Sequence, residues 1–600
     1  MLRRTLLKGL AASAVLPACP WLDLAARAAT LPSLRRVRPG DPAWPNAASW
    51  QSLKDSVGGN LLPVQAPFAI CAADMEAAAC QDAVGNIKNP FYLGDQAGGT
   101  QVSGWLDAWM PQPSVYAVRA RHAADMAAAI TFARRNNLRL VVKGTGHSYL
   151  GTSNAPDSLL LWTRGMNDVT LHDAFVPAGS KLAPVPAVTA GAGCVWIDLY
   201  HAVTTVAGRY VQGGGCTDVG VAGLVQGGGF GSLSKGFGTA AASLLEAEVV
   251  TADGAIRTVN HAQEPDLFWA LKGGGGGTFA AVTKLTLRTH DLPRWFGFVS
   301  GTIKAANDDA FRRLLARFVA FYARDLFNPH WGEQAKIGAD NTLALSMLCQ
   351  GLEQDAPQKI WQPFFDWVRG SSDYTIAEPL RARGFEARHM WNIAGNPAMI
   401  PDKRPGAPGW HGWWEGDQGQ VGAFLHGYDS LWLSQSLLRA AAQPKLVEAL
   451  FAASRFKEVQ LHFNKGIAGA SADAMSTTRD TATNPQVCEA FVLVIIADGE
   501  GPVYPGLGRT FDQAAAHKDA DAIAHASAAL RKIAPDAGSY VAESNYFIAN
   551  WKDAYWGDNY ARLRAIKDRY DPDGLFFAHH GVGSEDWSAD GFVRMVGGKG

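Results

Sequence analysis

Residues 212–238 read QGGGCTDVGVAGLVQGGGFGSLSKGFG, with two glycine clusters flanking one cysteine and a short apolar run. Glycine is costly inside regular helices and strands, so this density predicts tight backbone turns or the close approach of a ligand to the backbone. Flexible linkers are rich in glycine and serine but lack apolar residues. Because Val221, Leu224 and Val225 lie inside the stretch, we interpret it as a folded site for a flat or phosphate-bearing molecule.

A second glycine turn lies upstream, in residues 138–150, which read LRLVVKGTGHSYL. The apolar run is typical of a buried strand, and the turn after it carries His147. A strand that ends in a turn with free N–H groups can hold an anion such as a pyrophosphate. A Rossmann unit would need the pattern GxGxxG at this place. Tyr149 stands where the third glycine is required, which argues against that unit.

Four segments, in this order, resemble the vanillyl-alcohol-oxidase and berberine-bridge-enzyme superfamily of flavoproteins. They are KGTGHSYLG (143–151), GGGCTDVGVAGLVQGGG (213–229), PDLFWALKGGGGGTF (265–279) and NYARLRAIKDRYDPDGLF (559–576). The resemblance covers residues 110–290 and 535–585 well and the middle of the chain loosely. It implies an α+β fold, with a two-part FAD-binding domain of the vanillyl-alcohol-oxidase type and an inserted substrate domain built on an antiparallel sheet.

The resemblance also sets the expected domain boundaries. We expect an export signal (1–29), an N-terminal wrapping segment (30–110), the FAD-binding domain (111–291), the substrate domain (292–530) and a C-terminal segment that completes the FAD domain (531–600). A chain of 600 residues is too long for one ordinary domain, which agrees with this division.

In family members that carry both glycine motifs, the turn histidine bonds the flavin 8α carbon and the later cysteine bonds ring carbon 6. The resemblance therefore implies FAD bound covalently through His147 and Cys216. Further cofactor contacts are expected from Gly144, Thr145, Gly146, Ser148, Gly151, Gly215, Thr217, Val219, Gly220, Gly223, Gly228, Gly229 and Val249.

Oxidation of a hydroxyl group requires a base near the flavin. Relatives use a tyrosine or glutamate in the strand before the C-terminal closure, where this chain reads YVAESNYF (540–547). The candidates are Tyr540, Glu543 and Tyr546, with His462 on a second expected strand. Relatives often read Tyr-x-Asn there, whereas this chain has Ala542 at the asparagine position, so the role is not transferred directly.

The resemblance implies an oxidase that removes a hydride from an alcohol or sugar hydroxyl carbon and passes the electrons to O2, giving H2O2. The segments GHSYLG, APDSLLLW and HHGVGSE are most similar to the isoamyl-alcohol-oxidase-like branch. The residue three after the cysteine controls oxygen access in the berberine-bridge group, and Val219 is the valine common in oxidases. The alternatives are a flavin dehydrogenase that reduces a quinone or protein acceptor, and a flavin-fold binding protein without activity, against which His147 and Cys216 argue.

Composition excludes some partners. The net charge of −1 gives no support for binding to nucleic acid or to an anionic membrane. No Cys/His spacing suggests a metal site.

Cys71 and Cys80 are placed to pair across a short loop in an oxidising compartment. Trp410, Trp413 and Trp414 are expected either to stack on a substrate or to fill the space between domains.

The first 30 residues read MLRRTLLKGLAASAVLPACPWLDLAARAAT and resemble a twin-arginine export signal. Arg3 and Arg4 precede a short apolar stretch, and Ala28 ends a small-residue cleavage site. Cys19 in LPAC leaves open a lipid anchor instead of cleavage. No segment is long and apolar enough to span a bilayer. We therefore expect a periplasmic or extracellular protein.

Local patterns predict helices over 125–137, 197–206, 265–271, 309–326 and 560–570, and a hairpin over 246–260 with its turn at Asp253 and Gly254. Strands are expected near 114–120, 138–142, 159–162, 185–193 and 279–289, and in the substrate domain near 342–349, 422–428, 459–465 and 491–497.

Overall fold

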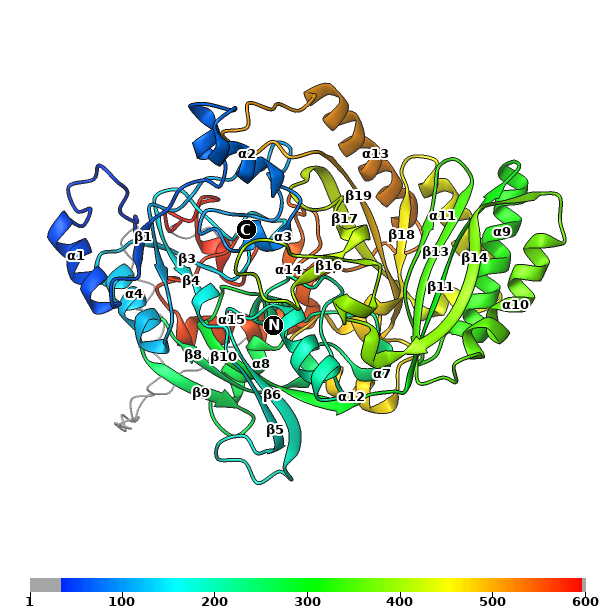
Figure 1. Ribbon diagram of the computed structural model, residues 1–600, viewed down its shortest axis with the longest axis horizontal. Coiled ribbons are helices and arrows are strands. Elements are labelled where there is room, and N and C mark those ends of the chain that lie inside the picture. The colour runs from blue at the N-terminus through cyan, green and yellow to red at the C-terminus, as the bar shows by residue number, and fades with distance from the viewer. Residues whose placement is uncertain (1–33, 596–600) are drawn as a thin grey trace, which may run out of the picture.

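The computed structural model describes residues 34–595 of the chain. Figure 1 shows two regions side by side, and the chain passes from the first to the second and back again. Residues 34–291 and 535–595 form the region on the left, and residues 295–531 form most of the region on the right. The fold is α+β, with one region formed by two separate parts of the chain and an antiparallel-sheet region inserted between them, as the resemblance implied. We call the two-part region the FAD-binding region after that expectation.

The first sheet has the strand order β1-β2-β4-β3. Its strands are β1 (Leu61–Pro63), β2 (Tyr116–Arg119), β3 (Arg139–Lys143) and β4 (Ser158–Trp162). The last three are parallel, so β2 and β3 need a crossover, which is helix α4 (Ala123–Arg135). That helix begins where Asp125 accepts the N–H groups of Arg121 and His122. Met126 and Ile130 lie on its buried face.

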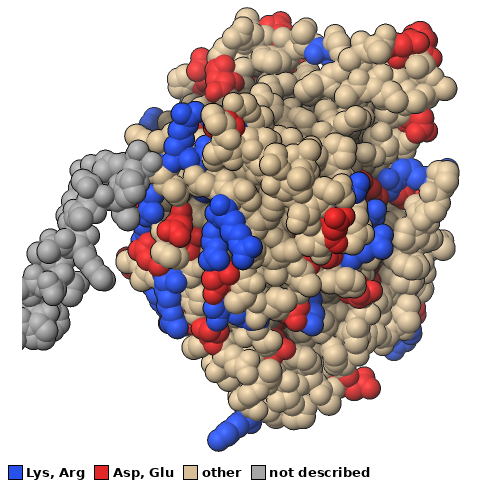
Figure 2. Space-filling model, turned by 90° about the vertical axis from the view of Figure 1, so that its left-hand side faces the viewer, with Lys and Arg blue, Asp and Glu red and all other residues tan. Residues whose placement is uncertain are grey.

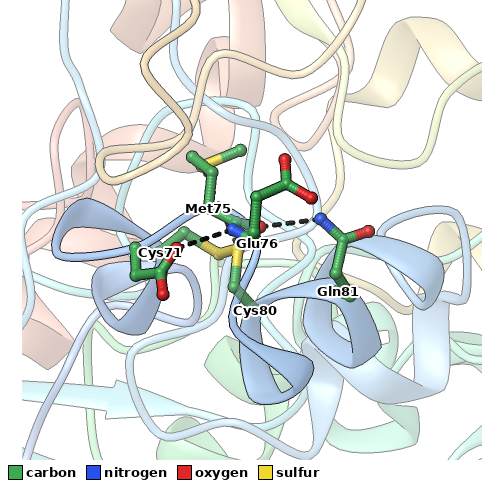
Figure 3. Close-up of a disulfide and its surroundings, with 6 residues drawn as sticks. Cys71, Met75, Glu76, Cys80 and Gln81 are labelled. Atoms are coloured by element: carbon green, nitrogen blue, oxygen red, sulfur yellow. Dashed lines mark hydrogen bonds between the residues drawn. A yellow bond between two sulfur atoms is a disulfide. The ribbon is translucent and has the colours of Figure 1, made fainter.

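Three short helices belong to the N-terminal part of the chain, one before β1 and two between β1 and β2. They are α1 (Ala47–Ser56), α2 (Ala78–Gly85) and α3 (Pro90–Gly94). A disulfide between Cys71 and Cys80 joins a 3-10 turn to α2, which confirms the expected pairing (Figure 3). Met75 lies inside the closed loop, and its carbonyl accepts a hydrogen bond from the Gln81 side chain.

The second sheet is antiparallel, with the order β5-β6-β10-β8-β9 and β7 also paired to β10. Its strands are β5 (Val169–Phe175), β6 (Val185–Gly191), β7 (Arg209–Val211), β8 (Leu244–Val250), β9 (Ile256–Asn260) and β10 (Ala281–Asp291). The expected hairpin turn is present, with Gly254 at φ 84°. Four short helices accompany this sheet: α5 (Trp196–Leu199), α6 (Val221–Gln226), α7 (Ser234–Phe237) and α8 (Pro265–Leu271).

The third sheet has seven antiparallel strands in the order β14-β11-β13-β12-β18-β19-β17. They are β11 (Trp295–Ala305), β12 (Trp331–Ile337), β13 (Thr342–Gln350), β14 (Tyr374–Glu386), β17 (Phe424–Ser434), β18 (Val459–His462) and β19 (Ala490–Glu500). Helices α9 (Asp308–Phe321), α10 (Ala356–Arg369), α11 (Gln443–Ser454) and α13 (Gln513–Arg531) share a core with it. Figure 1 shows α9, α10 and α11 on the far side of the sheet from the FAD-binding region.

Smaller elements fill the space between the two regions. A two-stranded sheet pairs β15 (Met399–Pro401) with β16 (Gly412–Trp414), and helix α12 (Ala472–Arg479) lies against α7. The buried ammonium of Lys235 on α7 also links the regions. It donates to the carbonyls of Gly466 and Ala468, each at 2.6 Å, and burial lowers the pKa of Lys235 to about 7.

The C-terminal segment closes the FAD-binding region through α14 (Trp551–Trp556) and α15 (Tyr560–Tyr570). Phe576 forms a parallel bridge with Leu140 of β3. A buried ion pair joins Lys567 to Asp571 at 2.6 Å, and Asp571 also accepts the N–H groups of Leu575 and Phe576. These bonds explain why α15 ends at the aspartate of the DPDG turn.

Three expectations about local structure are corrected. Residues 540–547 are not a strand but a turn, because the N–H of Glu543 bonds the carbonyl of Tyr540 at 2.9 Å. The helix expected over 197–206 changes after Leu199 into a π-helix over Tyr200–Val206. The strand expected over 459–465 ends at His462 and continues as a 3-10 turn.

Positive and negative side chains are interspersed on the face shown in Figure 2, and neither sign dominates it. Within residues 34–595 every helix is too short or too polar to cross a bilayer. The expected export signal and Cys19 lie outside the described residues.

Candidate functional site

A cavity of about 1640 Å³ lies between the FAD-binding region and the seven-stranded sheet. Pockets for a single drug-sized ligand usually measure about 300–1,000 Å³, so this cavity has room for a dinucleotide and a second molecule. One side, the glycine wall, consists of the lining residues within 144–148, 214–227 and 275–278. The other side, the sheet wall, consists of the lining residues of β12, β13, β17, β18 and β19 and of the turn 463–465.

The glycine wall leaves space where side chains would otherwise stand. A Cβ atom built on Gly215, Gly223 or Gly277 would meet no other atom within 4 Å, although all three line the cavity. Their missing side chains therefore let a bound molecule approach the main chain. A flat ring system and a pyrophosphate both need this kind of surface, so the residues present fit FAD.

The turn that carries His147 is fixed by neighbouring backbone. Gly146 has φ 87°, and a Cβ there would lie 2.9 Å from the Gly99 carbonyl oxygen, so no other residue fits without strain. The carbonyl of Gly146 accepts the N–H of Gln101 at 3.1 Å. Lys143, at the end of β3, holds the facing loop by donating to the carbonyls of Gln96, Ala97 and Gly99.

His147 lies in the cavity with its imidazole oriented by a carboxylate. Its Nε2 contacts Oδ2 of Asp218, whose side chain is almost fully buried. Because Nε2 is engaged, Nδ1 is the ring nitrogen left to react with a ligand. Asp218 stands two residues after Cys216, so one loop supplies both a partner for His147 and the second expected attachment residue.

Cys216 also lines the cavity, in a different electrostatic setting. Its side chain interacts directly with that of Asp417. Burial, together with the Asp417 and Asp218 carboxylates, raises the pKa of the Cys216 thiol well above its usual value. Burial and the Asp218 carboxylate also raise the pKa of Asp417 to about 6.

Hydrogen bonds on both sides of Cys216 hold its loop. The Thr217 hydroxyl donates to the carbonyl of Gly412 at 2.7 Å, and the Trp414 indole donates to the carbonyl of Gly215 at 3.1 Å. The N–H of Ile197 bonds the Thr217 carbonyl at 2.9 Å, which ties the loop to α5. Strand β16 therefore joins the glycine wall to the segment that carries Asp417.

The expected cofactor contacts divide into two groups. Those that line the cavity are Gly144, Thr145, Gly146, His147, Ser148, Gly215, Cys216, Val219, Gly220 and Gly223. Those that do not are Gly151, Thr217, Gly228, Gly229 and Val249. Gly151 faces Trp109, where a Cβ would lie 2.6 Å from the indole, and Val249 is fully buried in β8. These five residues do not contact the cavity, and they pack behind the residues that line it.

The candidate bases also differ in position. Tyr540, Glu543 and His462 line the cavity, whereas Tyr546 lies behind it and stacks on His579 with ring centroids 3.9 Å apart. Glu543 forms an ion pair with Lys465, whose Nζ lies 2.6 and 2.5 Å from its two oxygens. Burial and the Glu543 charge raise the pKa of the Tyr540 phenol well above its usual value. Burial and the Lys465 ammonium lower the pKa of His462 well below 6.5.

The three tryptophans of residues 410–414 have different surroundings. Trp414 lines the cavity. Trp413 is buried in the core of the FAD-binding region near Phe91. Trp410 is 40% exposed and stacks on His201 with centroids 4.7 Å apart. One of the three is therefore available to a bound molecule.

Sequence reasoning missed several acidic and basic side chains of the cavity. Asp218 contacts His147 without lining the cavity itself, and it had a signal, since it lies in the Cys216 motif. Asp417, Lys465 and Glu333 line the cavity but lie far away in the chain. Glu333 on β12 has φ 66°, which breaks the alternation of the strand, so Glu333 and Gln334 both line the cavity. Left-handed backbone at a residue other than glycine is often found at functional sites. Burial raises the pKa of Glu333 above its usual value.

Comparisons with known proteins agree with this geometry. The FAD binding domain family matches residues 114–260, and the berberine and berberine-like family matches residues 539–583. A VAO-type flavoprotein oxidase of Thermothelomyces thermophilus is 29% identical over 598 residues, covering 93% of this chain and 95% of the relative. The chain is similar to the vanillyl-alcohol-oxidase and berberine-bridge-enzyme-like superfamily along nearly its whole length. It is an FAD-linked oxidoreductase with the cofactor domain in two parts.

Solved structures of this superfamily share the fold. The crystal structure of a VAO-type flavoprotein from Myceliophthora thermophila C1 superposes with a TM-score of 0.76, at 26% identity, covering 93% of this chain and 100% of that chain. A glucooligosaccharide oxidase from Acremonium strictum, described with a 6-S-cysteinyl, 8α-N1-histidyl FAD, has a TM-score of 0.62 at 18% identity. It covers 89% of this chain and 99% of that chain.

Proposed function

We propose that this protein oxidises the hydroxyl group of an alcohol or carbohydrate, using FAD bound covalently through His147 and Cys216 and O2 as the electron acceptor. The observation that carries the proposal is that His147 and Cys216 line one cavity, beside a glycine wall open to a flat ligand. Gly144, Gly146, Gly220 and Gly223 would hold the cofactor. When bound, FAD accepts the hydride from the hydroxyl-bearing carbon and passes the two electrons to O2.

The state of each attachment residue supports the covalent link. Asp218 holds Nε2 of His147, which leaves Nδ1 to form the bond. Cys216 lies near the same carboxylate, so one ring system can reach both residues. The glucooligosaccharide oxidase that shares the fold carries an FAD attached in both ways.

Glu543 is the best-suited base among the candidates in the sheet wall and beside it. The Lys465 ammonium orients its carboxylate, and both oxygens are acceptors for a substrate hydroxyl proton. Tyr540 keeps its proton at neutral pH, so it serves as a hydrogen-bond donor or acceptor to the substrate oxygen. His462 has a lowered pKa and is therefore a weaker base than an ordinary histidine. The proton balance closes when Glu543 takes the hydroxyl proton and releases it to the peroxide product.

Substrate and acceptor follow from the cavity. The sheet wall supplies polar groups such as Gln334 and Gln460, and Trp414 and Tyr428 add aromatic surface, as a sugar or polar alcohol requires. Val219 lines the cavity beside the cysteine loop and is small enough to leave O2 a path. The disulfide between Cys71 and Cys80 favours an oxidising, extracytoplasmic location, in line with the twin-arginine pattern.

An aerobic screen of alcohols, monosaccharides and oligosaccharides for peroxide tests this proposal. We expect H2O2 in a one-to-one ratio with oxidised product from at least one hydroxyl compound. Flavin reduction without peroxide, with turnover only when a quinone or protein acceptor is added, would instead assign a dehydrogenase. A Glu543→Gln variant that retains its flavin should reduce it about 100-fold more slowly under anaerobic conditions.

A further inference from the structure

Cys216 occupies an environment that opposes its ionisation. The thiolate, not the thiol, is the nucleophile that forms carbon–sulfur bonds. Reactive cysteines usually lie beside a cation or a helix N-terminus, whereas the carboxylates of Asp417 and Asp218 raise the pKa of Cys216 and outweigh the Lys465 ammonium. A thiol in this position needs a group that takes its proton as the bond forms.

Asp417 has the geometry for that task. It ends the turn Glu415–Asp417 that follows β16, and the bonds from Trp414 to Gly215 and from Thr217 to Gly412 hold this segment against the cysteine loop. Its Oδ2 is buried and finds no hydrogen-bond partner within residues 34–595. Asp218, the other nearby carboxylate, is already engaged with His147.

We propose that Asp417 accepts the proton of the Cys216 thiol when the flavin becomes attached there. This inference rests on the proposed attachment through Cys216. The sulfur forms a bond to ring carbon 6, the S–H proton passes to Asp417, and the hydrogen on that carbon leaves as a proton. Two electrons are released when C–H is replaced by C–S. Dioxygen, the oxidant of the proposed function, takes these electrons with the two protons and becomes H2O2.

The proposal predicts a pH dependence for attachment at Cys216. The groups that face Asp417 are Cys216, Asp218, His147 and Glu333, and Lys465 also faces the thiol. Burial and the acidic neighbours raise the pKa of Asp417 to about 6, so its base form becomes populated as the pH rises through that value. Attachment at Cys216 should therefore accelerate between about pH 5 and pH 7 and then level off.

The test follows attachment residue by residue. Full-length protein made in riboflavin-limited cells is given FAD, and peptide mass spectrometry measures the fraction of Cys216 and of His147 that carries flavin over time. Asp417→Asn should slow attachment at Cys216 by about 100-fold and leave attachment at His147 nearly unchanged. Glu415→Gln is the matched control, because it removes a carboxylate that also lines the cavity from the same turn but does not face Cys216, and it should behave like the wild type.

Alkylation of Cys216 by iodoacetamide, measured before FAD is added, shows whether Asp417 acts as a base or only repels the thiolate by its charge. Removing the Asp417 charge should lower the thiol pKa, so alkylation in Asp417→Asn should be faster, although flavin attachment is slower. The inference would be overturned, and the proposed double attachment would stand, if the wild type carries both bonds and Asp417→Asn attaches flavin to Cys216 as fast as the wild type does. Wild-type protein without flavin on Cys216 would overturn both this inference and the proposed double attachment.

Two further measurements decide the question if Asp417→Asn does not fold. Asp417→Glu keeps a carboxyl group and should restore part of the attachment rate at Cys216. The wild-type rate itself must rise with pH as described above. A rate that is constant from pH 5 to pH 8 would contradict the role of Asp417.

Discussion

The glycine wall presents main chain to the cavity, whereas the sheet wall presents side chains. Gly215, Gly223 and Gly277 leave open space where side chains would stand. On the opposite side, Ala335 and Ile337 of β12 face the helices, while Gln334 and Lys336 face the cavity. The glycine wall is made of loops and the short helix α6, whereas the sheet wall follows the alternation of a strand except at Glu333.

This difference assigns a task to each wall. A backbone surface suits a cofactor with a large flat ring and phosphates, because its shape is constant and it can be approached closely. A surface of side chains can change substrate preference without disturbing the cofactor. Substitutions in the glycine wall should therefore affect flavin binding first, and substitutions in the sheet wall should affect turnover first.

The largest effect is expected from Gly231→Ala, behind the glycine wall. Its Cβ would lie 1.7 Å from the carbonyl oxygen of Gly213, so the two glycine clusters could no longer pack. Because backbone cannot rotate away as a side chain can, we expect a loss of about 3 kcal/mol or more in unfolding free energy, with little flavin retained. Thermal unfolding and flavin absorbance measure both effects.

Gly215→Ala is the matched control in the same region. Its Cβ meets no atom within 4 Å, so stability should stay within about 0.5 kcal/mol of the wild type, while flavin content falls because the methyl group occupies the cavity. Equal stability of the two variants would show that the glycine clusters are not packed as described.

In the sheet wall, the ion pair between Lys465 and Glu543 gives the next effect. Its side chains are 13% and 20% exposed, so Lys465→Met should leave a poorly solvated carboxylate and lower the unfolding free energy by about 1–3 kcal/mol. Adding Glu543→Gln should recover most of that stability. Flavin content should remain at the wild-type level in both variants, and a loss of flavin in either of them would contradict the division between the walls.

The two walls also differ in how far the sequence predicts them. His147, Cys216 and Val219 line one cavity, and they could be singled out from the sequence because glycine turns around reactive side chains form short local motifs. Asp417 was missed, since it is brought to Cys216 by β16 from about 200 residues away. The wrongly expected strand over 540–547 came from the resemblance to relatives, because YVAESNYF does not alternate between apolar and polar residues. It closes into a turn because the Glu543 carbonyl accepts a bond from Ser430 on β17, a contact that no local pattern shows.

A smaller effect is expected from Val219, the residue of the glycine wall that we propose leaves a path for O2. Val219→Leu adds about one methylene beside the cysteine loop and should slow the reaction of reduced enzyme with O2 about fivefold, or ~1 kcal/mol. Dithionite-reduced protein mixed with O2 in a stopped-flow instrument gives this rate without a substrate. Anaerobic reduction should be nearly unchanged, and a slower reduction with unchanged reoxidation would place Val219 on the substrate path instead.

The central claim is that one flavin is joined to both His147 and Cys216, and acid denaturation tests it most directly. Precipitated wild-type protein should remain yellow, and its digest should contain flavin bound to peptides with both residues. His147→Ala and Cys216→Ala should each keep one bond, and the double variant should release all flavin into the supernatant. Release of the flavin from denatured wild-type protein would contradict the account.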